Sequence, residues 1–109
     1  MALLHASSAE PIDIRPLGAR LMSEKTVALF KSSELEVMRL VLAAGKAFPP
    51  HKVAGEITIQ CIEGRLDVTI DGASHVLEAG QLLFLAGGVV HGVAALQDSS
   101  ALVTISLPR

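Results

Sequence analysis

The sequence predicts an all-β protein built as an antiparallel sandwich or barrel of short strands. Apolar runs recur about every ten residues, which is the spacing typical of small antiparallel domains. Corners rich in glycine, proline and Asp-Gly separate these runs. In residues 65–70 the apolar Leu66, Val68 and Ile70 alternate with polar residues in period two, as expected for a strand with one buried face.

Composition limits both the organisation of the chain and its partners. A chain of 109 residues is large enough for one core and too short for two. The net charge is −2 with scattered Lys and Arg, which argues against nucleic acid or an anionic membrane as the main partner. Three Phe and no Trp or Tyr leave no aromatic platform for bases or sugars. The single cysteine, Cys61, excludes an internal disulfide.

The N-terminal residues carry no basic segment ahead of an apolar one, so we expect no secretory signal and a cytoplasmic protein. No uninterrupted apolar run approaches the roughly 20 residues of a membrane helix. Residues 1–24 are expected to form an irregular arm with a short extended segment near Ile12–Ile14. Because this arm is apolar, we expect it to pack on the domain formed by residues 25–109 or on a second subunit.

Two strands are predicted in the first half of the domain, at residues 26–30 and 35–42. Residues 34–44 also contain good helix formers, so a helix is the alternative there. The shortness of the run and the Gly45 that ends it favour a strand. Pro49 and Pro50 then require an extended approach to His51.

The second half contains the strongest turn signal, Asp71-Gly72, which predicts a two-residue hairpin. Ile57–Ile62 is apolar on both faces, which predicts that both sides of this strand are covered. Further strands are predicted at residues 73–77, 82–85 and 101–107.

Two blocks of residues resemble the motifs of the cupin superfamily, and together they cover about the central half of the chain. The family's first motif reads G, five residues, H, one residue, H, three or four residues, E, six residues, G. Here Gly45, His51 and Gly64 match, whereas Val53 replaces the second histidine and Ile57 replaces the glutamate.

The second motif reads G, five residues, P, one residue, G, two residues, H, three residues, N. Here Gly80, Gly88 and His91 match, whereas Ala86 and Ala95 replace the proline and the asparagine. The resemblance implies an antiparallel double-stranded β-helix, the jelly-roll or RmlC-like cupin barrel, with His51 and His91 at its mouth.

The replaced positions bear on metal binding. In metal-binding cupins the two histidines and the glutamate of the first motif and the histidine of the second hold a divalent ion. A catalytic metal usually needs three protein ligands, and neither Val53 nor Ile57 can supply one. A bulge at Ala54-Gly55 would turn Glu56 inward. His51, Glu56 and His91 would then form a set able to hold Fe, Mn, Ni or Zn.

Alternation along the strand places Ile57, Ile59 and Cys61 on the inner face and Gln60 on the other. Gln60 is a candidate ligand-binding residue, with a cross-strand or interface hydrogen bond as the alternative. Arg39 would face a ligand carboxylate if its face is the inner one; otherwise it forms an edge or interface ion pair. Cys61 is expected to be a small buried hydrophobe.

The sequence predicts a small-molecule binding or sensing protein whose aliphatic pocket offers His51 and His91 as polar groups. The remaining histidines, His5 and His75, are expected on the surface. A metal-dependent enzyme of the oxygenase or isomerase type is the alternative, with His51, His91 and a substitute third ligand such as Glu56. We also expect a homodimer, because related small cupins commonly pair through sheet edges and N-terminal strands.

Overall fold

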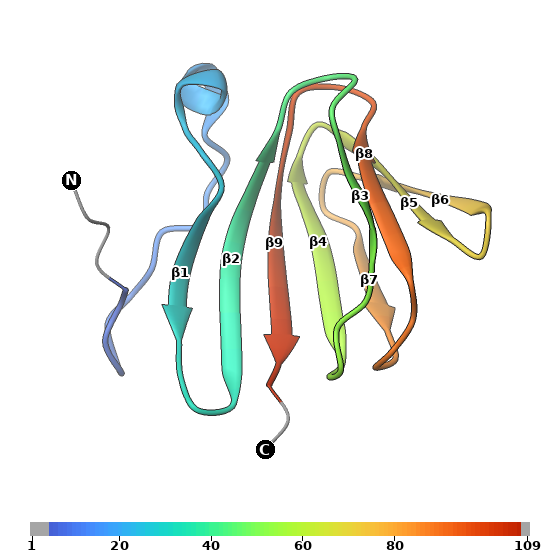
Figure 1. The fold of residues 1–109 in the computed structure, drawn as a ribbon. Coiled ribbons are helices and arrows are strands. Elements are labelled where there is room, and N and C mark those ends of the chain that lie inside the picture. Colours follow the sequence, from blue (N-terminus) through green and yellow to red (C-terminus); the bar gives the residue numbers. More distant parts are fainter. Residues whose placement is uncertain (1–4, 108–109) are drawn as a thin grey trace.

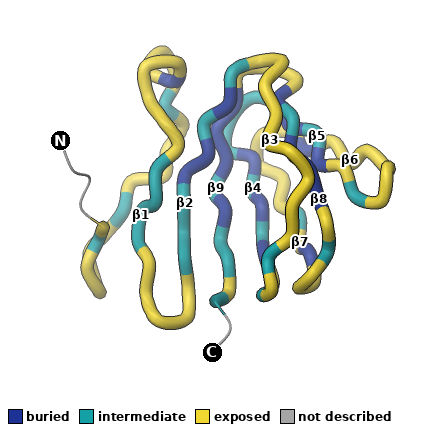
Figure 2. Tube along the Cα trace, viewed as in Figure 1, coloured by how far each residue is buried: buried dark blue, intermediate teal, exposed yellow. Residues whose placement is uncertain are grey.

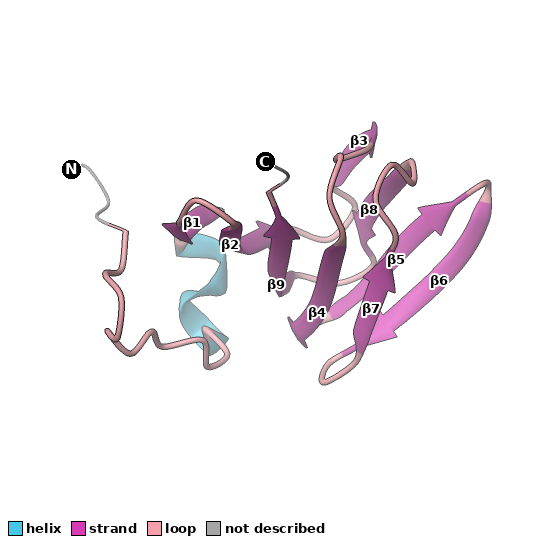
Figure 3. Cartoon of the chain, turned by 90° about the horizontal axis from the view of Figure 1, so that it is seen from below, coloured by secondary structure: helices cyan, strands magenta, loops and turns pink. Residues whose placement is uncertain are grey.

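The computed structural model describes residues 5–107, which form two antiparallel sheets (Figure 1). Strands β1-β2-β9-β4-β7 make a five-stranded sheet and strands β3-β8-β5-β6 make a four-stranded one. Figure 3 shows the two sheets as separate layers. The architecture is a jelly roll and confirms the predicted all-β fold. The strands are β1 (Val27–Lys31), β2 (Leu35–Leu42), β3 (Ala47–His51), β4 (Ile57–Glu63), β5 (Arg65–Ile70), β6 (Ala73–Glu78), β7 (Leu82–Leu85), β8 (His91–Ala95) and β9 (Ser99–Ser106).

Residues 35–42 form strand β2 throughout, so the helical alternative is wrong. The strand pairs with β9 along its whole length, and this pairing satisfies backbone groups that a helix would have satisfied internally. Leu40 and Leu42 are buried in the core. On β5, Leu66 and Val68 are only 1% and 0% exposed, as their alternation predicts.

The predicted hairpin at Asp71-Gly72 is confirmed, because Ile70 pairs with Ala73 across the two-residue turn. Asp71 has φ 51° and Gly72 has φ 75°. Left-handed conformations at both turn residues match the twist of the flanking strands, as Asp-Gly turns of this kind require.

The extended course at Pro49 and Pro50 is also confirmed, since both lie in strand β3. This strand is at the edge of the four-stranded sheet, the position where proline costs no ladder hydrogen bond. An irregularity in the β3–β8 pairing falls between Phe48 and His51, and the pairing resumes at His51 opposite His91. The edge strand therefore fixes the position of one motif histidine relative to the other.

The sequence patterns did not predict two elements. One is η1 (Gly18–Ser23), a 3-10 helix of six residues that buries Leu21. The other is strand β8, which carries His91. Ile12–Ile14 contains no strand. No helix in residues 5–107 is long and apolar enough to cross a membrane.

The core lies between the two sheets, and the buried positions in Figure 2 concentrate on the strands that face one another. Ile57, Ile59 and Cys61 of β4 are buried there, whereas Thr58 and Gln60 on the opposite face of the same strand are only half-buried. The inner side of this strand is therefore covered as predicted, whereas its outer side is only partly covered.

The part of the N-terminal arm that the structure describes, residues 5–24, lies beside β1 at the edge of the five-stranded sheet, and residues 1–4 lie outside the described range (Figure 1). The Ala6 N–H donates to the Leu29 carbonyl of β1 at 2.9 Å. Arg39 Nη1 of β2 donates to the Arg15 carbonyl at 2.9 Å. The Leu17 N–H donates to the Glu63 carboxylate of β4 at 2.8 Å. The arm thus contacts three strands of this sheet.

Candidate functional site

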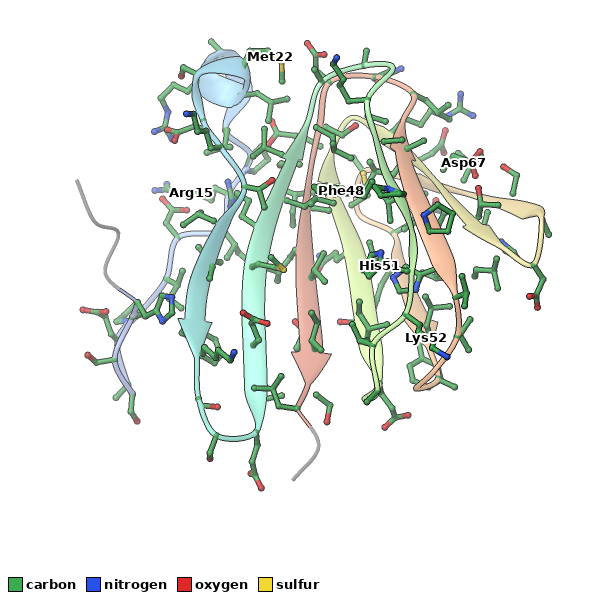
Figure 4. All side chains as sticks on the ribbon, viewed as in Figure 1. Arg15, Met22, Phe48, His51, Lys52 and Asp67 are labelled. Carbon is green, nitrogen blue, oxygen red and sulfur yellow. The ribbon has the colours of Figure 1, made fainter. Side chains whose placement is uncertain are left out.

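His51 and His91 are direct cross-strand partners in the β3–β8 pair. Side chains opposite one another on antiparallel strands lie on the same face of the sheet. The two imidazole rings are accordingly 4.7 Å apart between centroids, with an angle of 49° between their planes. His91 is 2% exposed, whereas His51, which is labelled in Figure 4, is solvent-exposed, so the pair extends from the interior to the surface.

Each ring has a backbone carbonyl beside its Nδ1 atom. His51 Nδ1 is 3.2 Å from the Pro49 carbonyl oxygen, and His91 Nδ1 is 3.0 Å from the Val89 carbonyl oxygen. A carbonyl oxygen can only accept, so in the neutral ring Nδ1 carries the proton and donates it. The Nε2 atom of each histidine then keeps its lone pair and is an acceptor for a ligand.

A cavity of about 150 Å³ adjoins the histidine pair, between the two sheets. Apart from the two imidazoles and one threonine, its lining is apolar. The lining residues are Thr26, Met38, Leu40, Phe48, His51, Ile57, Ile59, His91, Val93, Val103 and Ile105. We call this cavity the barrel pocket. Its composition suits a small molecule with an apolar body and one polar group near the histidines.

The structure does not bring Glu56 to the histidines. Glu56 lines a separate pocket on the outer face of the five-stranded sheet, together with Thr58 and Phe84. Within residues 5–107, no three His, Cys, Asp or Glu side chains gather closely enough to hold a metal ion. Val53 packs against the core, and Ile57 lines the barrel pocket at 4% exposure. The donors present therefore do not fit a three-ligand metal centre.

Gln60 and Arg39 also lie outside the barrel pocket. Both are register partners of Leu102 on β9, so they share the outer face of the sheet. Gln60 is half-buried there and Arg39 is 5% exposed. Of the four ligand-binding residues predicted from the sequence, the structure brings only His51 and His91 together.

Cys61 is fully buried, as predicted for a small hydrophobe. Burial raises the pKa of its thiol, which disfavours the reactive thiolate. His5 and His75 are exposed, as predicted. None of these three residues lines the barrel pocket.

Sequence reasoning did not identify most of the pocket wall. Phe48 and Val93 are neighbours in the β3–β8 pair, and Met38 of β2 meets them only through the packing of one sheet on the other. Alternation of apolar residues identified the inward side of β5 but left that of β2 open. It carried no signal for which inward positions border a cavity and which are packed solid.

The comparisons with known proteins agree with this architecture. Residues 38–107 match the family model described as a cupin domain. The chain belongs to the cupin family, and its fold is the RmlC-like jelly roll. No curated protein matches the chain significantly.

Several solved structures are similar to this chain. An RmlC-like cupin from Desulfovibrio desulfuricans is 27% identical, with a TM-score of 0.74, and the alignment covers 89% of this chain and 97% of that one. An RmlC-like cupin from Shewanella frigidimarina is 25% identical, with a TM-score of 0.73 and coverage of 98% and 94%. A conserved protein of unknown function from Streptococcus pyogenes is 18% identical, with a TM-score of 0.74 and coverage of 100% and 99%.

Proposed function

We propose that this cupin binds or senses a small, largely apolar molecule in the barrel pocket, with His51 and His91 as its polar contacts. The observation that carries the proposal is the cross-strand histidine pair, whose Nδ1 atoms face backbone carbonyls and whose Nε2 atoms are left as acceptors beside an apolar cavity. A ligand that suits two acceptors offers a hydrogen-bond donor.

The cavity size narrows the class of ligand. An apolar cavity of about 150 Å³ accepts a molecule of roughly benzene size. A ligand of that size with one hydroxyl or N–H group would place its donor at the histidine pair and its body against residues such as Ile59 and Val103. We therefore propose small alcohols, phenols or heterocyclic N–H compounds as the class to test first.

Phenol and toluene form a matched pair of probes, because they differ mainly in the hydroxyl group. We expect phenol to shift the NMR signals of the imidazole nitrogens saturably and toluene to bind more weakly. The variants His51→Phe and His91→Phe should each weaken phenol binding by about tenfold, the value of one hydrogen bond, and leave toluene nearly unchanged. His75→Phe, which alters an exposed histidine outside the pocket, is the control. Equal phenol affinity in all three variants would refute the proposal.

The paired Nε2 atoms also favour a second candidate, a metal-dependent enzyme that uses His51, His91 and a third ligand. Glu56 lies on the other face of the sheet, so this third ligand would have to come from elsewhere. Elemental analysis of the purified protein distinguishes the two functions. One tightly held transition ion per chain, lost in His51→Phe and in His91→Phe, would favour the enzyme over the binding protein.

We further propose that the chain forms a homodimer through the outer face of the five-stranded sheet. Leu82 and Phe84 of its edge strand β7 are 61% and 58% exposed, and Leu35 of β2 is 42% exposed. A second copy of this face would cover these side chains. Light scattering should then give a dimer for the parent chain and a monomer for Phe84→Lys, whereas a monomeric parent would contradict the proposal.

A further inference from the structure

A second cavity lies outside the barrel, between the N-terminal arm and strands β1 and β2, and has a volume of about 510 Å³. We call it the arm cavity. Its charged lining is mostly cationic, although the whole chain carries a net charge of −2. The charged residues are Arg15, Arg20, Lys25 and Arg39, against Asp13 and Glu24. Figure 4 shows Arg15 on the opposite side of β2 from His51, so the arm cavity is separate from the barrel pocket.

Two of the four cations already have carboxylate partners. Arg15 donates to both oxygens of Asp13, at 3.0 and 2.7 Å. Arg20 Nη1 lies 3.4 Å from a Glu24 oxygen. Neither Lys25 nor Arg39 has a carboxylate within salt-bridge distance among residues 5–107. The charges of these two side chains are therefore not neutralised by a salt bridge within residues 5–107.

Arg39 is the unusual member of the pair because it is 5% exposed. Its Nη1 donates to the Arg15 carbonyl at 2.9 Å, whereas its Nη2 is buried and has no hydrogen-bond partner. A buried guanidinium that lacks a hydrogen-bonded anion is energetically costly. Such a group is a strong binding element for any oxyanion that reaches it.

Glu63 is a carboxylate of the same sheet face, yet its hydrogen bonds go elsewhere. It accepts the Leu17 N–H at 2.8 Å and the Gly18 N–H at 3.0 Å. It also accepts a short hydrogen bond from the Ser100 hydroxyl. Its two oxygens are thus occupied by donors of the arm and of β9, and Arg39 is left without a bonded anion.

We propose that the arm cavity binds a small organic anion, with Arg39 and Lys25 holding a carboxylate or phosphate head group. The planar guanidinium matches either oxyanion through two parallel N–H donors. In this arrangement a ligand oxygen replaces the Arg15 carbonyl as the acceptor of the Arg39 Nη1 hydrogen bond. A small shift of the arm exposes Arg39 Nη2 to the same ligand. The cavity is of the size of ordinary ligand sites and larger than an inorganic oxyanion needs. Its aliphatic lining, which includes Leu17, Val27 and Leu29, would hold the organic body.

Four probes test this proposal on the full chain labelled with nitrogen-15: butyl phosphate, butyrate, inorganic phosphate and 1-butanol. We expect saturable NMR shifts at the Arg39 Nε–H and at the Leu17 and Gly18 amides with butyl phosphate, butyrate or both. Whichever of these two probes binds more tightly shows whether the site prefers a phosphate or a carboxylate head group. Inorganic phosphate should bind more weakly because it lacks the body, and 1-butanol should not bind at these residues. Added NaCl should weaken the binding of every anion.

Three variants complete the test. Arg39→Met and Lys25→Met should each weaken anion binding at least tenfold, whereas Arg65→Met, which alters an exposed arginine paired with Glu78, should leave it unchanged. Lys25 is exposed, so its variant gives an answer even if Arg39→Met does not fold. His51→Phe should bind the anion as the parent does, which separates this site from the barrel pocket. The proposal is overturned if no anion gives saturable shifts, or if Arg39→Met and Lys25→Met bind as tightly as the parent.

Discussion

The Glu63 carboxylate accepts the backbone N–H of Leu17 at 2.8 Å and so fastens the N-terminal arm to strand β4. Gly18 and Ser100 donate to the same carboxylate. Burial alone would raise the pKa of Glu63, but these three hydrogen bonds, together with the charge of Arg39, outweigh it and lower the pKa. The arm is thus held by a carboxylate that must stay ionised.

Replacing Glu63 by glutamine should destabilise the protein by about 1.5–3 kcal/mol, the range of hydrogen bonds to a charged group. The glutamine amide keeps the shape but presents N–H groups to at least one backbone donor. Urea unfolding of the parent and of Glu63→Gln measures the difference. Glu78→Gln is the matched control, since Glu78 is exposed and 3.6 Å from Arg65, and it should change stability by less than about 1 kcal/mol.

The same carboxylate should make stability pH-dependent. Because its folded pKa is lower than its ordinary value of 4.5, the unfolded chain takes up the proton first as the pH falls. The stabilisation is therefore complete well above pH 4.5 and is lost as the pH drops through the folded pKa. As the pH falls across this range, the free energy of unfolding measured in urea should decrease less for Glu63→Gln than for the parent. Parallel pH profiles for the two proteins would contradict the role given to Glu63.

Alanine at two glycine positions should lower the free energy of unfolding by different amounts, although both glycines have positive φ. Gly72, with φ 75°, has open space where a Cβ would stand, so Gly72→Ala should cost about 1–2 kcal/mol for the left-handed backbone alone. Gly64, with φ 84°, would place a Cβ in steric overlap with the Asp98 carbonyl oxygen. Gly64→Ala should cost about 1–3 kcal/mol more, because the β9 backbone must move as well. Thermal unfolding measures both, and equal costs would mean that this close approach is unimportant.

The Cys61 thiol should be inert in the folded protein. It is 0% exposed, and burial raises its pKa, so both access and ionisation oppose reaction. A disulfide reagent such as Ellman's should label the native chain at least about a hundredfold more slowly than the chain in guanidinium, because labelling requires opening of the core. Rapid labelling without denaturant would show that β4 opens readily.

Restoring the carboxylate at position 57 should create a metal site. Ile57 is buried at 4% exposure and lines the barrel pocket with both histidines, so Ile57→Glu would add a third ligand there. Without metal, the buried carboxylate should destabilise the fold by about 3–5 kcal/mol. Zn²⁺ should recover most of that loss by binding only the folded state. The double variant His51→Phe, Ile57→Glu should show no recovery, and an equal effect of Zn²⁺ on the parent would contradict the prediction.

The two histidines of the site could be anticipated because the motifs that carry them are local. The resemblance of the Gly45–His51 and Gly88–His91 spacings to the cupin motifs implied two histidines at the barrel mouth, and the structure pairs them across β3 and β8. The Glu56 prediction required a bulge at Ala54-Gly55 that would turn its side chain inward. The backbone instead keeps Glu56 on the outer face, where the Ser106 N–H donates to its carbonyl at 2.9 Å.

Arg39 shows why the surroundings of other residues could not be predicted from the sequence. Period-two alternation placed it on one face of β2, but whether that face was the inner one depended on the neighbouring strands. Its partner, the Arg15 carbonyl, lies 24 residues away, and no local pattern links the two.

Local patterns in the sequence were enough to predict most of the strands, the Asp71-Gly72 hairpin and the inward face of β5, because alternation and turn chemistry act between near neighbours. The sequence also determined that Val53 and Ile57 offer no metal ligand. Three relationships could be found only in the folded chain: His51 stands opposite His91, Arg39 lies beneath the arm, and Glu63 holds Leu17. Those relationships arise from the packing of segments far apart in the chain, and their energy is gained only when the two sheets and the arm come together.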